Sequence, residues 1–159
     1  MMREFEKKLQ QVDWQNLGMK DIPQWILAFA SDDRQMRKGA YMHFDYFVVY
    51  KGAESMEDLG RFEEVLETEA LVFIVPILID LLADKDAQDK QSILDVLNQL
   101  ALNMVSNKDE KREPYHSRAI RVYDAIRVGI PLYRYLYDAV DDFGKEVIKE
   151  LLETLENEK

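Results

Sequence analysis

The stretch Ile22–Asp33, with the sequence IPQWILAFASDD, places an apolar residue before a proline and an aspartate ten residues after that proline. The same spacing recurs in Val75–Asp86 and in Ile130–Asp141. The copies start at residues 22, 75 and 130, so successive copies are 53 and 55 residues apart. This interval is too long for a heptad and suits a helical hairpin with a linking segment. We therefore expect three repeated helical hairpins.

Apolar pairs three residues apart recur before and after each aspartate, which predicts one buried face on each helix of a hairpin. Proline suits the first turn of the earlier helix, because its missing N–H falls among donors that have no helical partner. An aspartate in the turn can cap the later helix, and Asp32, Asp84 and Asp141 lie where turns are expected. The predicted buried pairs are Trp25 with Ala28, Leu78 with Leu81, Tyr133 with Leu136, Phe44 with Phe47, Leu97 with Leu100, and Leu152 with Leu155.

The remaining elements follow from hydrophobic periodicity, from prolines and glycines, and from polar runs. Helix 114–127 is expected to bury Ala119, Ile120, Tyr123 and Ile126. The expected order is a helix over 2–12, a hairpin of helices 22–31 and 33–50, an acidic insertion over 51–66, a hairpin of helices 68–83 and 86–105, an exposed loop over 106–113, the helix over 114–127, and a third hairpin from Pro131 whose second helix covers 141–156.

Size and composition predict a single domain, residues 1–159. A chain of 159 residues with 47% hydrophobic residues can bury a sizeable core. The absence of cysteine excludes a disulfide framework and a thiolate site, and it favours a cytoplasmic protein. The longest apolar run, Ala70–Ile79, is too short to span a bilayer, and Met1–Gln11 lacks the apolar core of a signal peptide.

The net charge of −10 is unevenly distributed along the chain. Residues 54–69 carry a charge of −6 and residues 138–159 carry −5, whereas residues 108–127 carry +2. Such a surface repels nucleic-acid phosphates, so we expect no nucleic-acid partner. A basic protein is the partner that this charge favours. The alternative is that the acidic helices only keep the protein soluble.

The pattern of proline-initiated helix pairs with aspartate in the turn resembles the HEAT and armadillo class of α-solenoids. More narrowly, the chain is similar to small bacterial HEAT-repeat proteins, through Val75-Pro76-Ile77-Leu78, Tyr115-His116-Ser117-Arg118-Ala119 and Gly129-Ile130-Pro131. The resemblance implies an all-α fold: a short right-handed α-solenoid of about three hairpins with an N-terminal capping helix. Because proteins of this appearance include immunity partners of toxins, it also implies a toxin-neutralising role as one specific version of protein binding.

No constellation in the sequence predicts catalysis, and we expect a non-enzymatic protein without cofactor. The two histidines, His43 and His116, are 73 residues apart and are too few for a typical metal site. Neither a GxSxG motif, nor a phosphate-binding glycine loop, nor a dinucleotide fingerprint is present. Adjacent carboxylates such as Glu63 and Glu64 diverge on a helix, so they indicate a solvated face rather than an acid–base pair.

Aromatic and polar side chains outside the predicted core faces are the candidate contacts for a protein partner. Tyrosine and arginine in such positions favour interfaces, because they bring contact area at low entropic cost. The alternative is that these tyrosines pack at the margin of the core with the hydroxyl in water. The expected partner-binding residues are His43, Tyr46, Tyr50, Asn98, Asn103, Arg134 and Tyr135, together with the acidic residues of the C-terminal helix.

The sequence is compatible with two further functions. One is binding of a small ligand, as in bilin-lyase-like HEAT proteins, which requires an apolar pocket. The other is self-association, because the end hairpins of a short solenoid pair with copies of themselves unless they are capped. The N-terminal helix, anchored by Phe5 and Leu9, is the expected cap at one end, and the acidic C-terminal helix is the expected cap at the other.

Overall fold

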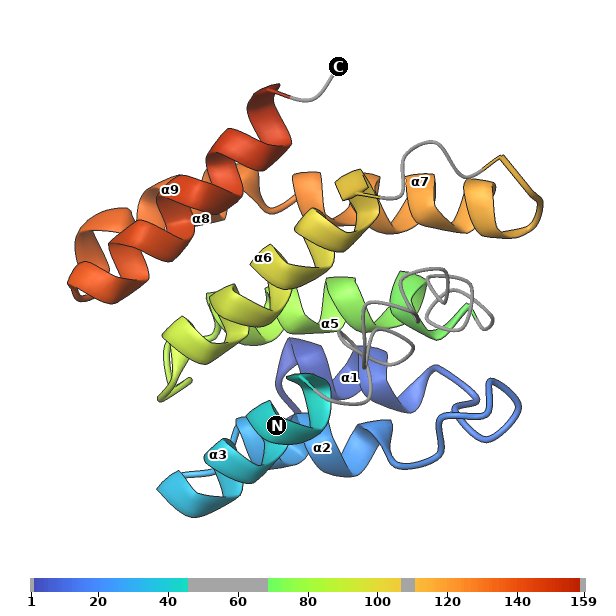
Figure 1. Ribbon diagram of the computed structural model, residues 1–159. Coiled ribbons are helices and arrows are strands. Elements are labelled where there is room, and N and C mark those ends of the chain that lie inside the picture. Colours follow the sequence, from blue (N-terminus) through green and yellow to red (C-terminus); the bar gives the residue numbers. More distant parts are fainter. Residues whose placement is uncertain (1, 46–68, 107–110, 158–159) are drawn as a thin grey trace.

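A computed structural model describes residues 2–45, 69–106 and 111–157, and within them the chain forms eight α-helices, one 3₁₀ turn and no β-strand (Figure 1). The all-α prediction is confirmed for these segments. The predicted insertion over 51–66 lies outside them, as do Phe47 and residues 107–110 of the predicted 106–113 loop. The elements are α1 (Glu4–Gln10), α2 (Ile22–Phe29), α3 (Arg34–His43), α5 (Ala70–Ala83), α6 (Lys90–Ser106), α7 (Tyr115–Arg127), α8 (Ile130–Leu136), η3 (Tyr137–Ala139) and α9 (Asp142–Asn157).

The helices pack in two rows. In one row α6 lies between α3 and α9, and in the other α5 lies between α1 and α7. Helices α2 and α3 form one antiparallel hairpin, α5 and α6 the second, and α8 and α9 the third. The first and third hairpins lie at opposite ends of the molecule (Figure 1). The three hairpins expected from the repeat are therefore present.

The main core lies between the two rows, where α5 and α6 contribute about half of the buried hydrophobic residues. Leu78 and Leu81 are buried as predicted, and so are Leu97 and Leu100. Each of these four side chains is completely shielded, so the middle hairpin carries the centre of the core. The other buried core residues of this hairpin are Ala70, Leu71, Ile74, Val75, Ile77, Leu82, Ile93, Leu94, Val96, Ala101 and Met104.

Three predicted core faces differ from the observed ones. In α9 the difference is small, because Leu155 is buried as predicted and Leu152 is half-buried. In α2 the fully buried residues are Ile22, Ile26 and Phe29, whereas Trp25 and Ala28 are only half-buried. Ile22, Ile26 and Phe29 are spaced by four and three residues, so they share one helix face. This buried face is rotated relative to the face of the predicted pair. The third difference lies in α7.

In α7 the buried residues are Val122 and Ile126, four positions apart. Ile120, which was predicted to be buried, is 48% exposed. The predicted Ala119 and Tyr123 are half-buried at the edge of the core. Ile126 is buried as predicted. The helix is rotated from the expected orientation, so Val122 is buried instead of Ile120.

The repeat prolines occupy two different positions. Pro23 and Pro131 lie in the first turn of α2 and α8, as predicted. Pro76 lies inside α5, which begins six residues earlier at Ala70. The expectation that the repeat proline lies in the first turn of a helix is therefore wrong for Pro76, because the apolar run before it is already helical. The predicted helix over 68–83 agrees with α5 within two residues at its start.

Aspartates cap the second helix of every hairpin, but only one of them is the predicted residue. The Gly144 amide donates to Asp141 Oδ1 at 2.8 Å, as expected. In the first hairpin the cap is Asp33, which accepts from the Gln35 amide at 2.8 Å. In the second it is Asp89, which accepts from the Ser92 amide at 3.1 Å. Asp32 and Asp84 were the predicted caps, and neither is the N-cap of the helix that follows it.

Helix α1 packs against α5 and not against the outer side of the first hairpin. Phe5 and Leu9 are buried, as expected for its anchoring residues. The indole Nε1 of Trp14 donates to the Leu9 carbonyl at 2.9 Å, which closes the turn after the helix. The prediction that α1 caps one end of the stack is wrong, since α2 and α3 are the outermost described helices at that end.

Gly129 has a steric role at the start of the third hairpin. A Cβ at this position would lie 2.5 Å from the Tyr133 ring, closer than any ordinary contact. Tyr133 is fully buried, and its hydroxyl donates to the Ile126 carbonyl at 2.8 Å. Burial raises the pKa of Tyr133 well above its ordinary value. Glycine is therefore required here so that α7 and α8 can approach around one aromatic ring.

Candidate functional site

The turns of the three hairpins follow one another along one edge of the molecule (Figure 1). Two glutamines of the middle hairpin connect these turns. The Gln88 amide donates to Asp32 Oδ1 at 3.5 Å, which joins the second turn to the first. The Gln91 amide nitrogen, oriented to satisfy its neighbours, donates to both carboxylate oxygens of Asp141 at 3.0 and 3.1 Å. Aspartates that are far apart in sequence are thus brought into one array.

We call this array the acidic edge and define it by the exposed aspartates of the three turns. An exposed carboxylate accepts hydrogen bonds from lysine or arginine, and several together attract a basic surface. Because each turn belongs to a different hairpin, a partner that binds along the edge must contact all three hairpins. The residues of the acidic edge are Asp32, Asp33, Asp86, Asp138 and Asp141.

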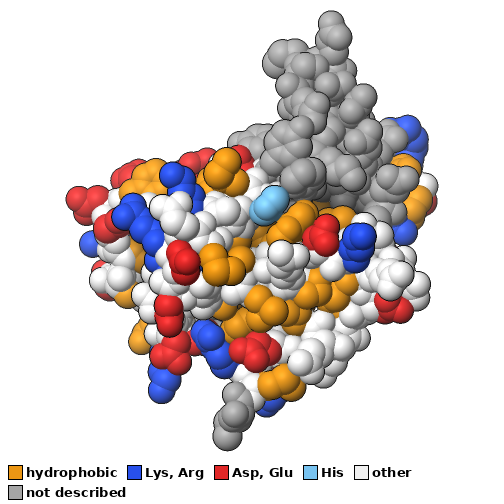
Figure 2. All heavy atoms as spheres, turned by 90° about the horizontal axis from the view of Figure 1, so that it is seen from below, with side chains coloured by type: hydrophobic (Ala, Val, Ile, Leu, Met, Phe, Trp, Pro, Cys, Tyr) orange, Lys and Arg blue, Asp and Glu red, His pale blue; other side chains and the backbone are white. Residues whose placement is uncertain are grey.

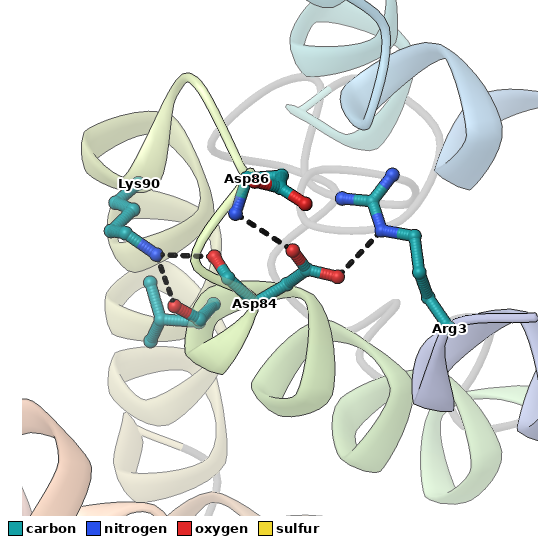
Figure 3. A network of polar contacts seen from close by, with 5 residues as sticks. Arg3, Asp84, Asp86 and Lys90 are labelled. Carbon is teal, nitrogen blue, oxygen red and sulfur yellow. Dashed lines mark hydrogen bonds and ion pairs between the residues drawn. The ribbon is translucent and has the colours of Figure 1, made fainter.

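The centre of the edge is a polar network that joins α1 to the turn between α5 and α6 (Figure 3). Arg3 Nε donates to Asp84 Oδ2 at 2.6 Å, and the other oxygen of Asp84 accepts from the Asp86 amide at 2.8 Å. Lys90 Nζ donates to the Leu82 and Asp84 carbonyls at 2.7 and 2.8 Å. The network fixes the turn backbone and leaves Asp86 exposed.

The ionisation of this network follows from its contacts. The hydrogen bond from Arg3 lowers the pKa of Asp84 below its ordinary value, with a further contribution from the Asp86 amide. The same hydrogen bond raises the pKa of Arg3. Burial lowers the pKa of Lys90, and the negative charge of Asp84 partly opposes that shift. Asp84 is therefore a structural carboxylate held in its ionised form.

A hollow of about 630 Å³ lies beside the network, and polar and charged side chains form most of its lining. Asp32 and Asp86 bring carboxylates to it, whereas Arg3 and Lys85 bring positive charge. Such a lining suits a polar group of a partner rather than an apolar ligand. The remaining lining residues are Ala30, Ala87 and Gln88.

A second polar contact joins α3 to α6, in the row formed by α3, α6 and α9. Tyr41 donates its hydroxyl proton to Asp95 Oδ2. Burial raises the pKa of Asp45, and the negative charge of Asp95 adds to that shift. The predicted contact residue Asn98 lies one turn after Asp95 but is only 2% exposed, and its Oδ1 has no hydrogen-bond partner. The structure places Asn98 in the core and not on a surface open to a partner.

The exposed end of the first hairpin carries a different surface. The rings of Trp25 and His43 stack with their centroids 5.0 Å apart and their planes nearly parallel. An open cavity of about 520 Å³ lies beside them, lined also by Met19 and Ile22. In Figure 2 hydrophobic side chains run across this end of the molecule. The other lining residues are Gly18, Lys20, Asp21 and Gln24.

The predicted contact residues do not form one surface. His43 is exposed at the end formed by α2 and α3. Arg134, which pairs with Glu156, and Tyr135, which is 78% exposed, belong to α8 at the opposite end. Asn103 is half-buried on α6 between them. Tyr46 and Tyr50, also predicted contacts, lie outside the described residues.

Sequence reasoning missed the residues that assemble the edge. Arg3 contacts a residue 81 positions away, and Gln88 contacts one 56 positions away. No local sequence pattern predicts such contacts, because a single arginine or glutamine near a predicted turn is expected to be an ordinary exposed residue. The only available signal was the repeat itself, which predicts that equivalent turns lie next to each other.

Two classes of site are not observed among the described residues. No group of three histidine, aspartate or glutamate side chains is arranged there to hold a metal ion. Within the same segments, none of the helices combines the length and the apolar character needed to cross a membrane. No family model, no curated protein and no solved structure matches this chain.

Proposed function

We propose that this protein is a non-enzymatic, cytoplasmic protein-binding module that binds a basic partner through its acidic edge. The observation that carries the proposal is the alignment of exposed aspartates from three hairpin turns along one side of the molecule. Their attraction for a basic surface raises the association rate and disfavours acidic partners. A fixed backbone below them reduces the entropy lost when a partner binds.

The arrangement of the turns is the strongest support for a binding role over mere solubility. Charges that only keep a protein soluble have no need of a common position. Here Gln88 and Gln91 of the middle hairpin reach the aspartate turns on either side. The network around Arg3 and Asp84 holds the central turn. The edge is therefore a built surface and not a scatter of exposed acids.

The two rows of helices fit a short HEAT-like α-solenoid, in which successive hairpins stack and their turns line one edge. In such a scaffold the turns form an extended surface that a partner contacts at several points. A basic toxin is one partner of the required chemistry, and neutralisation of such a toxin is a specific version of the proposal. A basic partner of any other kind satisfies the same physical argument.

The test is affinity capture from a lysate of the source organism at low and at high salt, with mass spectrometry of the retained proteins. A basic protein that is retained at low salt and released at high salt is expected. The same capture uses an edge variant with Asp32→Asn, Asp86→Asn and Asp138→Asn. All three residues are exposed, and none of them caps a helix, so the fold is expected to be unchanged.

The matched control removes the same charge elsewhere, with Glu146→Gln, Glu150→Gln and Glu153→Gln on the exposed face of α9. The proposal predicts that the edge variant loses the partner and that the α9 variant keeps it. Loss with the α9 variant alone would assign binding to the C-terminal helix, whose acidic residues were among the contacts expected from the sequence. Equal retention by all three proteins would contradict an electrostatic binding surface.

A small-ligand function is the second candidate, and the cavity beside Trp25 and His43 favours it. Its volume of about 520 Å³ lies within the usual range for ligand sites, and apolar and aromatic side chains form part of its lining. A bilin, as in bilin-lyase-like proteins, is a planar ligand that can be tested by a colour change on mixing. Intrinsic Trp25 fluorescence provides a second readout, with Trp25→Phe as the control for the remaining tryptophan, Trp14.

A further inference from the structure

We infer that copies of this chain associate head to tail, with the α2–α3 end of one copy against the α8–α9 end of the next. This inference concerns the two ends and does not rest on the proposed role of the acidic edge. It starts from the finding that α1 lies beside α5, so that α2 and α3 are the outermost of the described helices at that end. A stack of repeats whose end is not covered by a polar cap exposes the kind of surface that its neighbours bury.

Large hydrophobic side chains are concentrated at both ends. Ten such side chains are exposed among the described residues, and six of them belong to the two end hairpins. On α2 and α3 they are Leu27, Met36 and Met42, which are 50%, 52% and 61% exposed. On the third hairpin they are Tyr135, Tyr137 and Phe143, which are 78%, 40% and 58% exposed. Contact between two copies at these ends would remove these apolar side chains from water, which favours association.

The two end helices carry opposite charge. Helix α3 contains Arg34, Arg37 and Lys38 and no acidic residue. Helix α9 contains five acidic residues and two lysines, which gives −3. Arg34, Lys38 and Met42 are spaced by four, so they share one face of α3. The corresponding exposed face of α9 carries Glu146, Glu150 and Glu153.

This complementarity selects a second copy, in a head-to-tail orientation. Two α9 faces repel each other because both are acidic, and two α3 faces repel each other because both are basic. An α3 face against an α9 face is the one combination that pairs opposite charges. The contact is heterologous, so it adds copies in sequence rather than closing a symmetric dimer. The net charge of −10 opposes association at long range, so weak association is expected.

The first experiment measures molar mass by light scattering and sedimentation over a range of protein concentrations at physiological ionic strength. Salt at this level screens repulsion between distant charges more than attraction between charges in contact. The inference predicts that the average mass rises continuously with concentration, beyond that of a dimer. A mass that stays monomeric up to near-millimolar concentration would overturn it, as would a mass that stops at the dimer.

The second experiment identifies the surfaces by charge reversal. One variant carries Arg34→Glu and Lys38→Glu, and the other carries Glu150→Lys and Glu153→Lys. All four residues are exposed, so both variants are expected to fold, and circular dichroism checks this. Each variant alone should associate about tenfold more weakly than the original chain, since each contact now pairs like charges.

An equimolar mixture of the two variants should recover association, because every contact between the two kinds of chain again pairs opposite charges. A symmetric contact through α9 predicts a different result: the α3 variant would associate as well as the original chain. That result would overturn the inference, and so would a mixture that stays as weak as its components. None of these outcomes depends on a basic partner, so failure here leaves the acidic edge to be judged separately.

Discussion

In the two outer hairpins the repeat proline opens a helix, whereas in the middle hairpin the equivalent Pro76 lies inside α5. The residue two positions before the proline accounts for the difference. It is Asp21 in the first hairpin and Gly129 in the third, and both precede the first helical residue as N-caps. In the middle hairpin it is Ile74, which is fully buried in the core. The proline therefore does not mark the start of a helix where an apolar run before it is already helical.

The comparison shows that one sequence landmark can serve two purposes. The outer hairpins use proline and a small or polar residue to define where a helix begins. The middle hairpin extends its first helix through the proline and so gains apolar residues for the centre of the core. Its second helix then begins late, at Lys90, and takes its cap from Asp89. The middle hairpin is the scaffold on which the outer two are placed.

The largest expected effect is at Gly129, where only glycine leaves room for the Tyr133 ring. Gly129→Ala should lower the free energy of unfolding by about 2–3 kcal/mol, because a buried ring must move. The matched control is Gly39→Ala inside α3, where an added Cβ meets nothing within 4 Å. That change should raise the free energy of unfolding by roughly 0.5–1 kcal/mol through helix propensity. Urea unfolding measures both, and a loss of equal size at the two sites would contradict the steric role of Gly129.

The two kinds of proline should respond in opposite directions to alanine. Pro76→Ala should raise the free energy of unfolding by about 1 kcal/mol or more, because a proline inside a helix forfeits a backbone hydrogen bond and crowds the preceding turn. Pro23→Ala should lower it by up to about 1 kcal/mol, because a residue already fitted to the first helical turn is replaced by a freer one. Thermal unfolding of both variants checks the signs, and destabilisation of equal size would show that Pro76 has the same role as Pro23.

The caps of the middle hairpin provide a finer test. Asp89→Ala should lower the free energy of unfolding by about 1 kcal/mol, because the Ser92 amide loses its acceptor. Asp86→Ala should have a smaller effect, because the Asp86 side chain is exposed and caps no helix. Chemical unfolding distinguishes the two. A larger loss at Asp86 than at Asp89 would contradict Asp89 as the cap of α6.

The smallest effect concerns pH and the contact between α1 and the middle hairpin. The pKa of Asp84 is lowered by the hydrogen bond from Arg3, so its contribution to stability is present above its unfolded pKa of about 4. That contribution is lost as the pH falls through the folded-state value. Asp84→Asn should therefore be less stable than the original chain by about 1 kcal/mol at pH 7, and the difference should shrink in acid. Unfolding over a pH series measures this, and a difference that does not change with pH would contradict the ionic role of Asp84.

Much of the fold could be predicted, because the repeat specifies equivalent helices and apolar spacing identifies the buried faces of the middle hairpin. In α2 and α7 several apolar positions compete for the core, and the observed buried face is rotated from the predicted one. The residues that cap the second helices could not be predicted. Two aspartates lie close together in the first turn and three in the second, and any of them could occupy the N-cap position. Asp33 prevails over Asp32, and Asp89 over Asp84 and Asp86.

The candidate site was harder to predict than the fold. His43 is exposed, whereas Asn98 was expected to contact a partner and is buried. The sequence around a polar residue on a long helix does not predict which other helices will cover it. The acidic edge depends on contacts of Arg3, Gln88 and Gln91 with residues distant in sequence, and only the assembled hairpins bring them together.

The most direct test of the acidic edge is a calorimetric titration of the captured basic partner against the original chain and against the variant with Asp32→Asn, Asp86→Asn and Asp138→Asn. At low salt the edge variant should bind about tenfold more weakly or worse, since three exposed charges contribute together. Its affinity should also depend less steeply on salt concentration than that of the original chain. Equal affinity and equal salt dependence for the two proteins would contradict binding through the hairpin turns.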